Sequence, residues 1–348
     1  MKHPLLLLLL LAAPCMAAST TGVDALSPAD VSKAMDALKK TYASPISATE
    51  LERDTLQGAL DRMAPQVALL SGTDAAPAGC PFYSEDFNGT GYLRPGLLNA
   101  EAAARTAGVL KDWSGKSVAA VVLDLRGTPP GSDFDAALAL EQEFSPKGAP
   151  LFTLSQTSSG AVTGAPPASG QPGLFTGILV VLVDESTAEA AEAVAASLQA
   201  GEKAMIVGAT TAGRGFEYED VPLNGAVLRM AVAEVVLPNG AKLGAAGLKP
   251  DIAVAAGPVP ESRLMESITA SGVDSVIEEH DRPHLNEAAL VSGSNPDVDE
   301  LEAEQAGRLS VPPMIDRQLQ QALDVVTSIS IYQAKDRGGS GGAANAAP

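Results

Sequence analysis

The stretch from Asp184 to Gly215, DESTAEAAEAVAASLQAGEKAMIVGATTAGRG, has the residue order of a catalytic segment. An apolar strand leads into a short turn, a helix, a second strand and a Gly-X-Gly loop. Within this frame Glu189 stands near the start of the helix, and Arg214 stands between the two glycines of the loop. A guanidinium keeps its proton up to about pH 12, so Arg214 cannot act as a general base. The pattern therefore predicts an opposite-charge pair within a segment that has the layout of an active site.

The elements around this segment predict an α/β core. Continuous apolar runs at 118–125, 177–184 and 204–208 are typical of strands buried on both faces of a parallel sheet. Helical patterns follow the first two runs, and a β-hairpin is expected to turn at Asn239–Gly240. Ligands of such sheets bind where the carboxyl ends of strands meet helix N-termini. Two junctions fit this description, LDLRGTPPG and VDESTAE.

The start of the chain predicts export. Residues 1–17 combine a basic start with a short apolar run and small residues, which is the pattern of a secretory signal peptide. A lipid anchor on Cys15 stays open as an alternative. After cleavage Cys80 is the single cysteine, either a structural thiol or a reactive or intermolecular one. The formal net charge of −19 argues against binding to nucleic acid or to anionic membrane surfaces.

The remaining segments complete a predicted domain plan. Two capped helices are expected in an N-terminal helical segment, with Ser47 and Glu50 forming a capping box. We expect these helices to mediate a possible homodimer. The sequence predicts the following boundaries: signal peptide 1–17, helical segment 18–70, loop 71–90, core 91–270, C-terminal helical extension 271–335 and disordered tail 336–348.

Five segments in order resemble one family: VVLDLRGTPPG, VLVDESTAEAAEAVAASLQ, IVGATTAGRG, GLKPDIAV and DRQLQQALDVV. Together they are similar to the C-terminal processing, or tail-specific, proteases of the S41 serine peptidase family. The resemblance covers residues 91–254 and the last helix. It implies an α/β fold with a ClpP/crotonase-like mixed sheet core and helical segments at both ends. Members of the family usually carry a PDZ domain, for which the loop 71–90 is too short.

The resemblance also places the family's catalytic groups on altered residues. Aligning the family pattern G-S-A-S-A-S-E so that it ends at Glu192 puts the nucleophile at Glu189. The family spacing of 25 then puts the lysine base at Arg214 and the orienting glutamine at Tyr218. If the family geometry holds, Glu189 and Arg214 form an ion pair. The oxyanion loop contains Pro130, which lacks an N–H to donate.

These substitutions predict a catalytically inactive pseudo-peptidase that binds a peptide or a protein partner. The predicted signal peptide implies that this protein is exported to the periplasm or secreted. The predicted binding residues are Arg126, Gly127, Gly131, Glu189, Ala190 and Arg214. A first alternative is an active serine endopeptidase with a displaced nucleophile at Ser186 or Thr187. A base for it would have to be His280, His284 or Lys203, all expected at the surface. A second alternative is a protein that binds an apolar small ligand. No metal or cofactor is expected.

Overall fold

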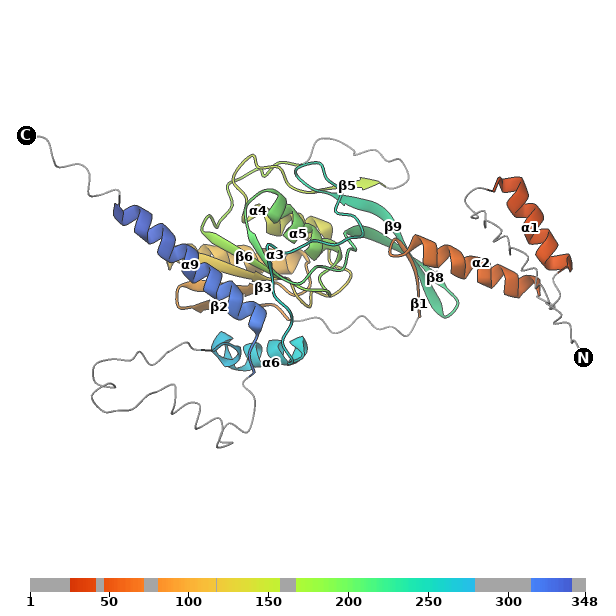
Figure 1. Cartoon of the computed structure of the whole chain (residues 1–348). Helices are drawn as coiled ribbons and strands as arrows, with labels where there is room; N and C mark the ends of the chain where they lie inside the picture. The colour runs from red at the N-terminus through yellow and green to blue at the C-terminus, as the bar shows by residue number, and fades with distance from the viewer. Residues whose placement is uncertain are drawn as a thin grey trace, which may run out of the picture. The chain divides into compact units, whose positions relative to one another are not determined.

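The computed structural model describes residues 26–41, 47–71, 81–116, 118–156, 167–278 and 314–339. Its main sheet has six strands in the order β10-β7-β6-β4-β3-β2 (Figure 1). All neighbouring pairs are parallel except β2 and β3, so the predicted α/β core with a mixed sheet is confirmed. The strands are β2 (Tyr83–Phe87), β3 (Thr90–Arg94), β4 (Ala120–Asp124), β6 (Ile178–Val183), β7 (Met205–Gly208) and β10 (Ile252–Ala253).

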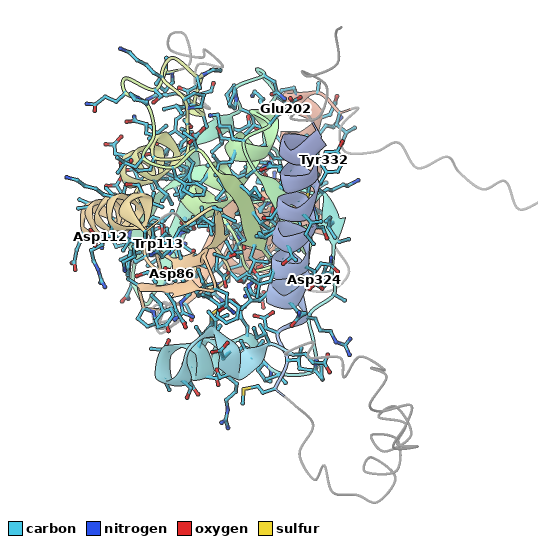
Figure 2. All side chains as sticks on the ribbon, turned by 90° about the vertical axis from the view of Figure 1, so that its left-hand side faces the viewer. Asp86, Asp112, Trp113, Glu202, Asp324 and Tyr332 are labelled. Atoms are coloured by element: carbon cyan, nitrogen blue, oxygen red, sulfur yellow. The ribbon has the colours of Figure 1, made fainter. Side chains whose placement is uncertain are left out.

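Helices cover both faces of this sheet. Alternate residues of β4 separate the two cores: Val121 and Leu123 pack into one, and Ala120 and Val122 pack into the other. The first core includes side chains of α3 (Ala100–Gly115), α4 (Phe134–Gln142) and α5 (Glu189–Ala200). The second includes α6 (Glu261–Ser271), η2 (Val273–Val276) and α9 (Arg317–Gly339). Figure 2 shows Trp113 of α3 and Tyr332 of α9 on opposite sides of the sheet.

A second, antiparallel sheet stands beside the first. Its central strand β9 (Ala226–Val236) pairs with β8 (Phe216–Leu223) on one side and with β1 (Val67–Ser71) and β5 (Thr153–Gln156) on the other. The long hairpin β8–β9 turns at Asn224–Gly225. The hairpin predicted at Asn239–Gly240 is short. Beyond that turn, Lys242 alone among the described residues forms a β-bridge, and its partner is Val236. Both turns have the Asn-Gly sequence that two-residue hairpins prefer.

Two expectations for the N-terminal third were wrong in part. Val67–Ser71 is a strand rather than the end of a helical segment, because it pairs with β9. Tyr83–Phe87 is a strand within the predicted loop 71–90, joined to β3 by Asn88–Gly89. Both turn residues have positive φ, 50° and 80°, as a tight Asn-Gly hairpin requires. The Asn-Gly dipeptide was the signal in the sequence that could have identified this hairpin.

The N-terminal helices form as predicted. They are α1 (Pro28–Thr41) and α2 (Ala48–Met63), of which residues up to Arg62 belong to a unit separate from the rest of the chain. The capping box is present, because the Ser47 N–H donates to Glu50 Oε2 at 2.8 Å and the Glu50 N–H donates to Ser47 Oγ at 3.1 Å. These hydrogen bonds lower the pKa of Glu50. The predicted homodimer through these helices stays a prediction.

Several other expectations lie outside the described residues: the signal peptide 1–17, Cys15, Cys80, His280 and His284. The last helix extends to Gly339, a few residues into the segment 336–348 predicted to be disordered, of which 340–348 are not described. Among the helices that the structure describes, none is both long enough and apolar enough to span a membrane.

Candidate functional site

The turn between β6 and α5 is organised by Asp184. Its Oδ1 accepts hydrogen bonds from the N–H groups of Ser186 and Thr187, both at 3.0 Å. The hydroxyls of the same two residues also donate to Oδ1, at 2.8 and 2.9 Å. Thr187 is fully buried and accepts the Asp184 N–H at 3.0 Å. The two hydroxyls therefore shape the turn, and no lysine or histidine among the described residues hydrogen-bonds to them.

Glu189 is held in a conformation that side chains rarely adopt. It is the first residue of α5 and has a φ of 54°, in the left-handed region. Strained strand-to-helix turns are the places where many hydrolases present a nucleophile. The Glu189 carboxylate accepts the Gly131 N–H at 3.1 Å and lies 3.6 Å from the Arg229 guanidinium. Its side chain is only 12% exposed. The turn thus presents a carboxylate to a backbone N–H donor.

Arg214 does not pair with Glu189, which corrects the expected ion pair. Its side chain is exposed, and no described residue forms an ion pair or hydrogen bond with its guanidinium. The two residues meet through the backbone, where the Glu189 N–H donates to the Arg214 carbonyl at 3.1 Å. The reason lies on β9, a strand distant in sequence, from which Arg229 reaches the carboxylate of Glu189. Arg229 was not predicted as a site residue.

The Gly-X-Gly loop is held by Glu192. This buried carboxylate accepts the Gly213 N–H at 2.9 Å, the Arg214 N–H at 2.8 Å and the Thr211 hydroxyl. Burial raises the pKa of Glu192, and the hydrogen bonds oppose that rise. Gly213 has a φ of 66°, and a Cβ there would collide with the Ala245 carbonyl oxygen. The loop is therefore fixed from α5, with the Arg214 side chain directed outward.

A cavity of about 340 Å³ opens in front of Glu189. It is formed by the 131–135 loop at the start of α4 and by residues of β5, β8 and β9. Its lining includes the acidic side chains of Asp133, Asp135, Glu189, Glu217 and Asp220, with Arg229 as its cation. Phe134, Leu154 and Tyr218 supply apolar surface. Among the described residues that line it, none is a lysine, histidine or cysteine.

Tyr218 and Arg229 form one wall of this cavity. Arg229 binds Asp220 through two hydrogen bonds, of 2.8 and 2.9 Å, and its guanidinium lies 5.8 Å from the centre of the Tyr218 ring. The Tyr218 hydroxyl donates to the Pro65 carbonyl at 3.2 Å. Burial, reinforced by the nearby Glu189 carboxylate, raises the pKa of Tyr218 to about 12. Tyr218 therefore stays neutral and acts as a wall of the cavity.

Arg126, a predicted binding residue, does not line the cavity at Glu189. The side chain is 2% exposed. Its guanidinium binds Asp124 at 2.9 and 2.7 Å, Asp316 at 3.0 and 2.8 Å, and Gln318 at 3.0 Å. Five hydrogen bonds occupy all five N–H groups of a guanidinium. Arg126 therefore ties the end of β4 to the start of α9.

The other predicted binding residues occupy different environments. Gly131 lines the cavity, and its N–H is bound to Glu189. The Gly127 N–H lies 3.4 Å from Ser186 Oγ. The Ala190 side chain is fully buried in the core. Gly131 and Glu189 therefore line the cavity together, whereas Arg126, Ala190 and Arg214 are not part of its lining.

Lys203, expected at the surface, is largely buried. Its Nζ lies 3.2 Å from Glu141 Oε1, 2.9 Å from Ser145 Oγ and 3.3 Å from the Pro150 carbonyl. Burial raises the pKa of Glu141, and the Lys203 charge opposes that rise. Lys203 therefore stabilises the core as an ion pair, and it does not serve Ser186. The described residues contain no cluster of three potential metal ligands.

A double-mutant cycle separates the two candidate partners of Glu189. Changing Glu189 and Arg229 to glutamine, singly and together, is expected to give a coupling energy of about 0.5–1 kcal/mol, typical of a partly exposed ion pair. The matched cycle with Arg214→Gln is expected to give coupling close to zero. Urea unfolding followed by circular dichroism measures both cycles. A larger coupling for Arg214 than for Arg229 contradicts the geometry described above.

Comparison with known proteins agrees with the resemblance in the sequence. A model of peptidase family S41 matches residues 89–254. The carboxyl-terminal-processing protease of Synechocystis sp. is 29% identical over 168 residues, which are 46% of this chain and 37% of that protein. The carboxy-terminal-processing protease of Bartonella bacilliformis is 30% identical over 186 residues, 49% of this chain and 40% of that protein. The chain spans about two fifths of the length of these curated relatives.

Comparison with solved structures gives partial matches, two of which follow. A photosystem II D1 C-terminal processing protease is 24% identical with a TM-score of 0.41, covering 54% of this chain and 48% of that chain. A lipoprotein from Streptococcus agalactiae is 16% identical with a TM-score of 0.45, covering 70% and 88%. With the family match, the motifs and the mixed sheet in agreement, residues 89–254 are a domain of peptidase family S41, homologous to the carboxyl-terminal processing proteases.

Proposed function

We propose that this chain is an exported S41 pseudo-peptidase that binds a peptide segment or a segment of a partner protein in the cavity at Glu189 without hydrolysing it. One observation carries the proposal: the Gly131 N–H already donates its hydrogen bond to the Glu189 carboxylate. Acyl transfer needs such donors for the oxyanion that develops, and losing one costs about 10²–10³-fold in rate. A carboxylate of the same chain leaves that N–H unavailable to a substrate carbonyl.

The remaining chemistry around the cavity supports an inactive site. A serine nucleophile needs a neighbouring base, and a lysine base needs a pKa lowered toward neutrality. The position equivalent to that lysine is Arg214, which cannot lose its proton. Ser186 is the accessible hydroxyl in the turn, and it donates to Asp184. The pKa of Asp184 is lowered by hydrogen bonds from its neighbours, which outweigh the effect of its burial, so its carboxylate is a weak base.

The cavity favours a peptide over the apolar ligand of the second alternative. Its size suits a few side chains of an extended segment, and charged groups surround its aromatic wall. An acyl chain would have to desolvate several carboxylates without giving them hydrogen bonds, which is costly. A peptide offers backbone N–H groups and side-chain donors to the same carboxylates.

Incubation with an unfolded protein tests the absence of hydrolysis. The purified chain is expected to leave reduced, carboxymethylated α-lactalbumin intact in a time course followed by gel and mass spectrometry. An active S41 peptidase prepared alongside shows that the substrate is cleavable. Cleavage by the wild type that disappears in Ser186→Ala or Thr187→Ala would overturn the proposal, because it would identify a displaced nucleophile. The Glu189→Ser, Arg214→Lys double variant shows whether restoring the two family residues is sufficient for activity.

Binding is tested separately by fluorescence polarisation with labelled fragments of the same unfolded protein. Glu217 lines the cavity from β8, whereas Glu219 is an exposed residue of the same strand outside the lining. Glu217→Lys is expected to change the affinity at least fivefold, and Glu219→Lys is expected to leave it within twofold. Equal effects of the two variants would place any binding outside the cavity.

A further inference from the structure

We propose that Glu261 and Asp184 share one proton in a buried carboxyl pair, and that this proton holds the turn that carries Glu189. The pair joins two segments that are far apart in sequence. Glu261 is the first residue of α6, and Asp184 directly follows β6. The inference goes beyond the proposed function and holds whether or not the cavity binds a peptide.

The two carboxyl groups lie close together. Both side chains line the same small cavity, and each shifts the pKa of the other. Two ionised carboxylates repel each other at that separation, so one of the two must carry a hydrogen. Glu261 Oε1 is buried and receives no hydrogen bond from any described residue, as expected for an oxygen that needs its own proton.

The charges around the pair assign the proton to Glu261. Glu261 and Asp184 line a small cavity of about 50 Å³. Its lining also includes Arg126, which follows β4, and Asp316 and Gln318 at the start of α9. Asp124 adds a further carboxylate from β4. On β3, the Arg94 side chain reaches α6 further along, at Met265 and Thr269.

The single guanidinium within that cluster, Arg126, is already bound to Asp124 and Asp316. Burial, together with the hydrogen bond to Asp184 and its charge, raises the pKa of Glu261 to about 9. The pKa of Asp184 is lowered instead, because Glu261, Ser186 and Thr187 donate to it.

The pair acts on the site through Asp184. Its Oδ1 is the acceptor for the Ser186 and Thr187 N–H groups, and Thr187 lies two residues before Glu189. Removing the shared proton places a second negative charge against Asp184 and repels the first turn of α6. The hydrogen bonds of the turn must then rearrange, so Glu261 is a positioning residue for Glu189.

Nuclear magnetic resonance on the purified wild-type chain tests both halves of the inference. With side-chain ¹³C-labelled glutamate, the Glu261 Cδ signal is expected to titrate several pH units above the ordinary glutamate value of about 4.3. The backbone amide signals of Ser186 and Thr187 are expected to titrate with the same midpoint. These measurements need no variant, so they stand even where a substitution impairs folding.

Variants then show which carboxyl group causes the titration of the two amide signals. Glu261→Gln is expected to abolish the titration of the Ser186 and Thr187 amides. Glu266→Gln, at an exposed glutamate of the same helix, is expected to preserve it. A Glu261 midpoint near the ordinary glutamate value would overturn the shared proton. A high midpoint without a matching change at Ser186 and Thr187 would overturn the positioning role.

Discussion

Replacing Arg126 by methionine is expected to destabilise the protein by about 3–5 kcal/mol, the usual cost of removing one partner from a buried ion pair. The change leaves the Asp124 and Asp316 carboxylates buried without the guanidinium that binds both. The Tyr92 hydroxyl still donates to Asp124, at 2.7 Å, and two backbone N–H groups still donate to Asp316. These neutral donors do not replace the positive charge. Urea unfolding followed by circular dichroism measures the loss.

The neighbouring residue Arg317 provides the control. It is exposed at the start of α9, one position from Asp316, so Arg317→Met removes an arginine charge beside the cluster without removing one of its contacts. Its effect is expected to stay within about 0.5 kcal/mol. Arg126→Met is also expected to make α9 more accessible to proteases, because Arg126 connects that helix to β4. Equal stabilities of the two variants would show that the buried cluster contributes little.

Replacing Glu261 by glutamine is expected to stabilise the protein by about 3 kcal/mol at pH 7. The folded state keeps the Glu261 proton up to about pH 9, whereas the unfolded chain releases it near 4.5. A raised folded pKa contributes stability that is complete below the unfolded pKa and is lost as the pH rises toward the folded pKa. Wild type therefore loses stability between about pH 4.5 and 9, whereas glutamine keeps an N–H donor for Asp184 throughout.

Urea unfolding at a series of pH values between 5 and 9 measures this effect. The difference in free energy of unfolding between Glu261→Gln and wild type is expected to grow with pH across that range. Asp184 does not interfere, because a lowered pKa affects stability only as the pH falls below about 3.8. Glu266→Gln is expected to show a constant difference. Parallel curves for Glu261→Gln and wild type would contradict the raised pKa.

The sequence was most informative where local pattern and burial coincide. The strands β4, β6 and β7 were identified because continuous apolar runs of this length fit a sheet that is covered on both faces. The capping box at Ser47 and Glu50 was identified because its hydrogen bonds join residues three apart. The strand β2 was missed because its residues, YSEDF, are mostly polar and only its pairing with β3 defines it.

By itself the sequence determined the family, the mixed α/β core and the unusual residues at positions 189 and 214. Those properties follow from residue order and apolar periodicity. Only the tertiary structure decided which groups meet. Arg229, rather than Arg214, reaches Glu189, because β9 brings Arg229 to the first residue of α5 and the Arg214 side chain is exposed. Arg126 binds Asp316, and Glu261 meets Asp184, because the starts of α9 and α6 lie at the carboxyl end of the sheet. Contacts between residues so distant in sequence depend on how the helices pack, which local patterns do not encode.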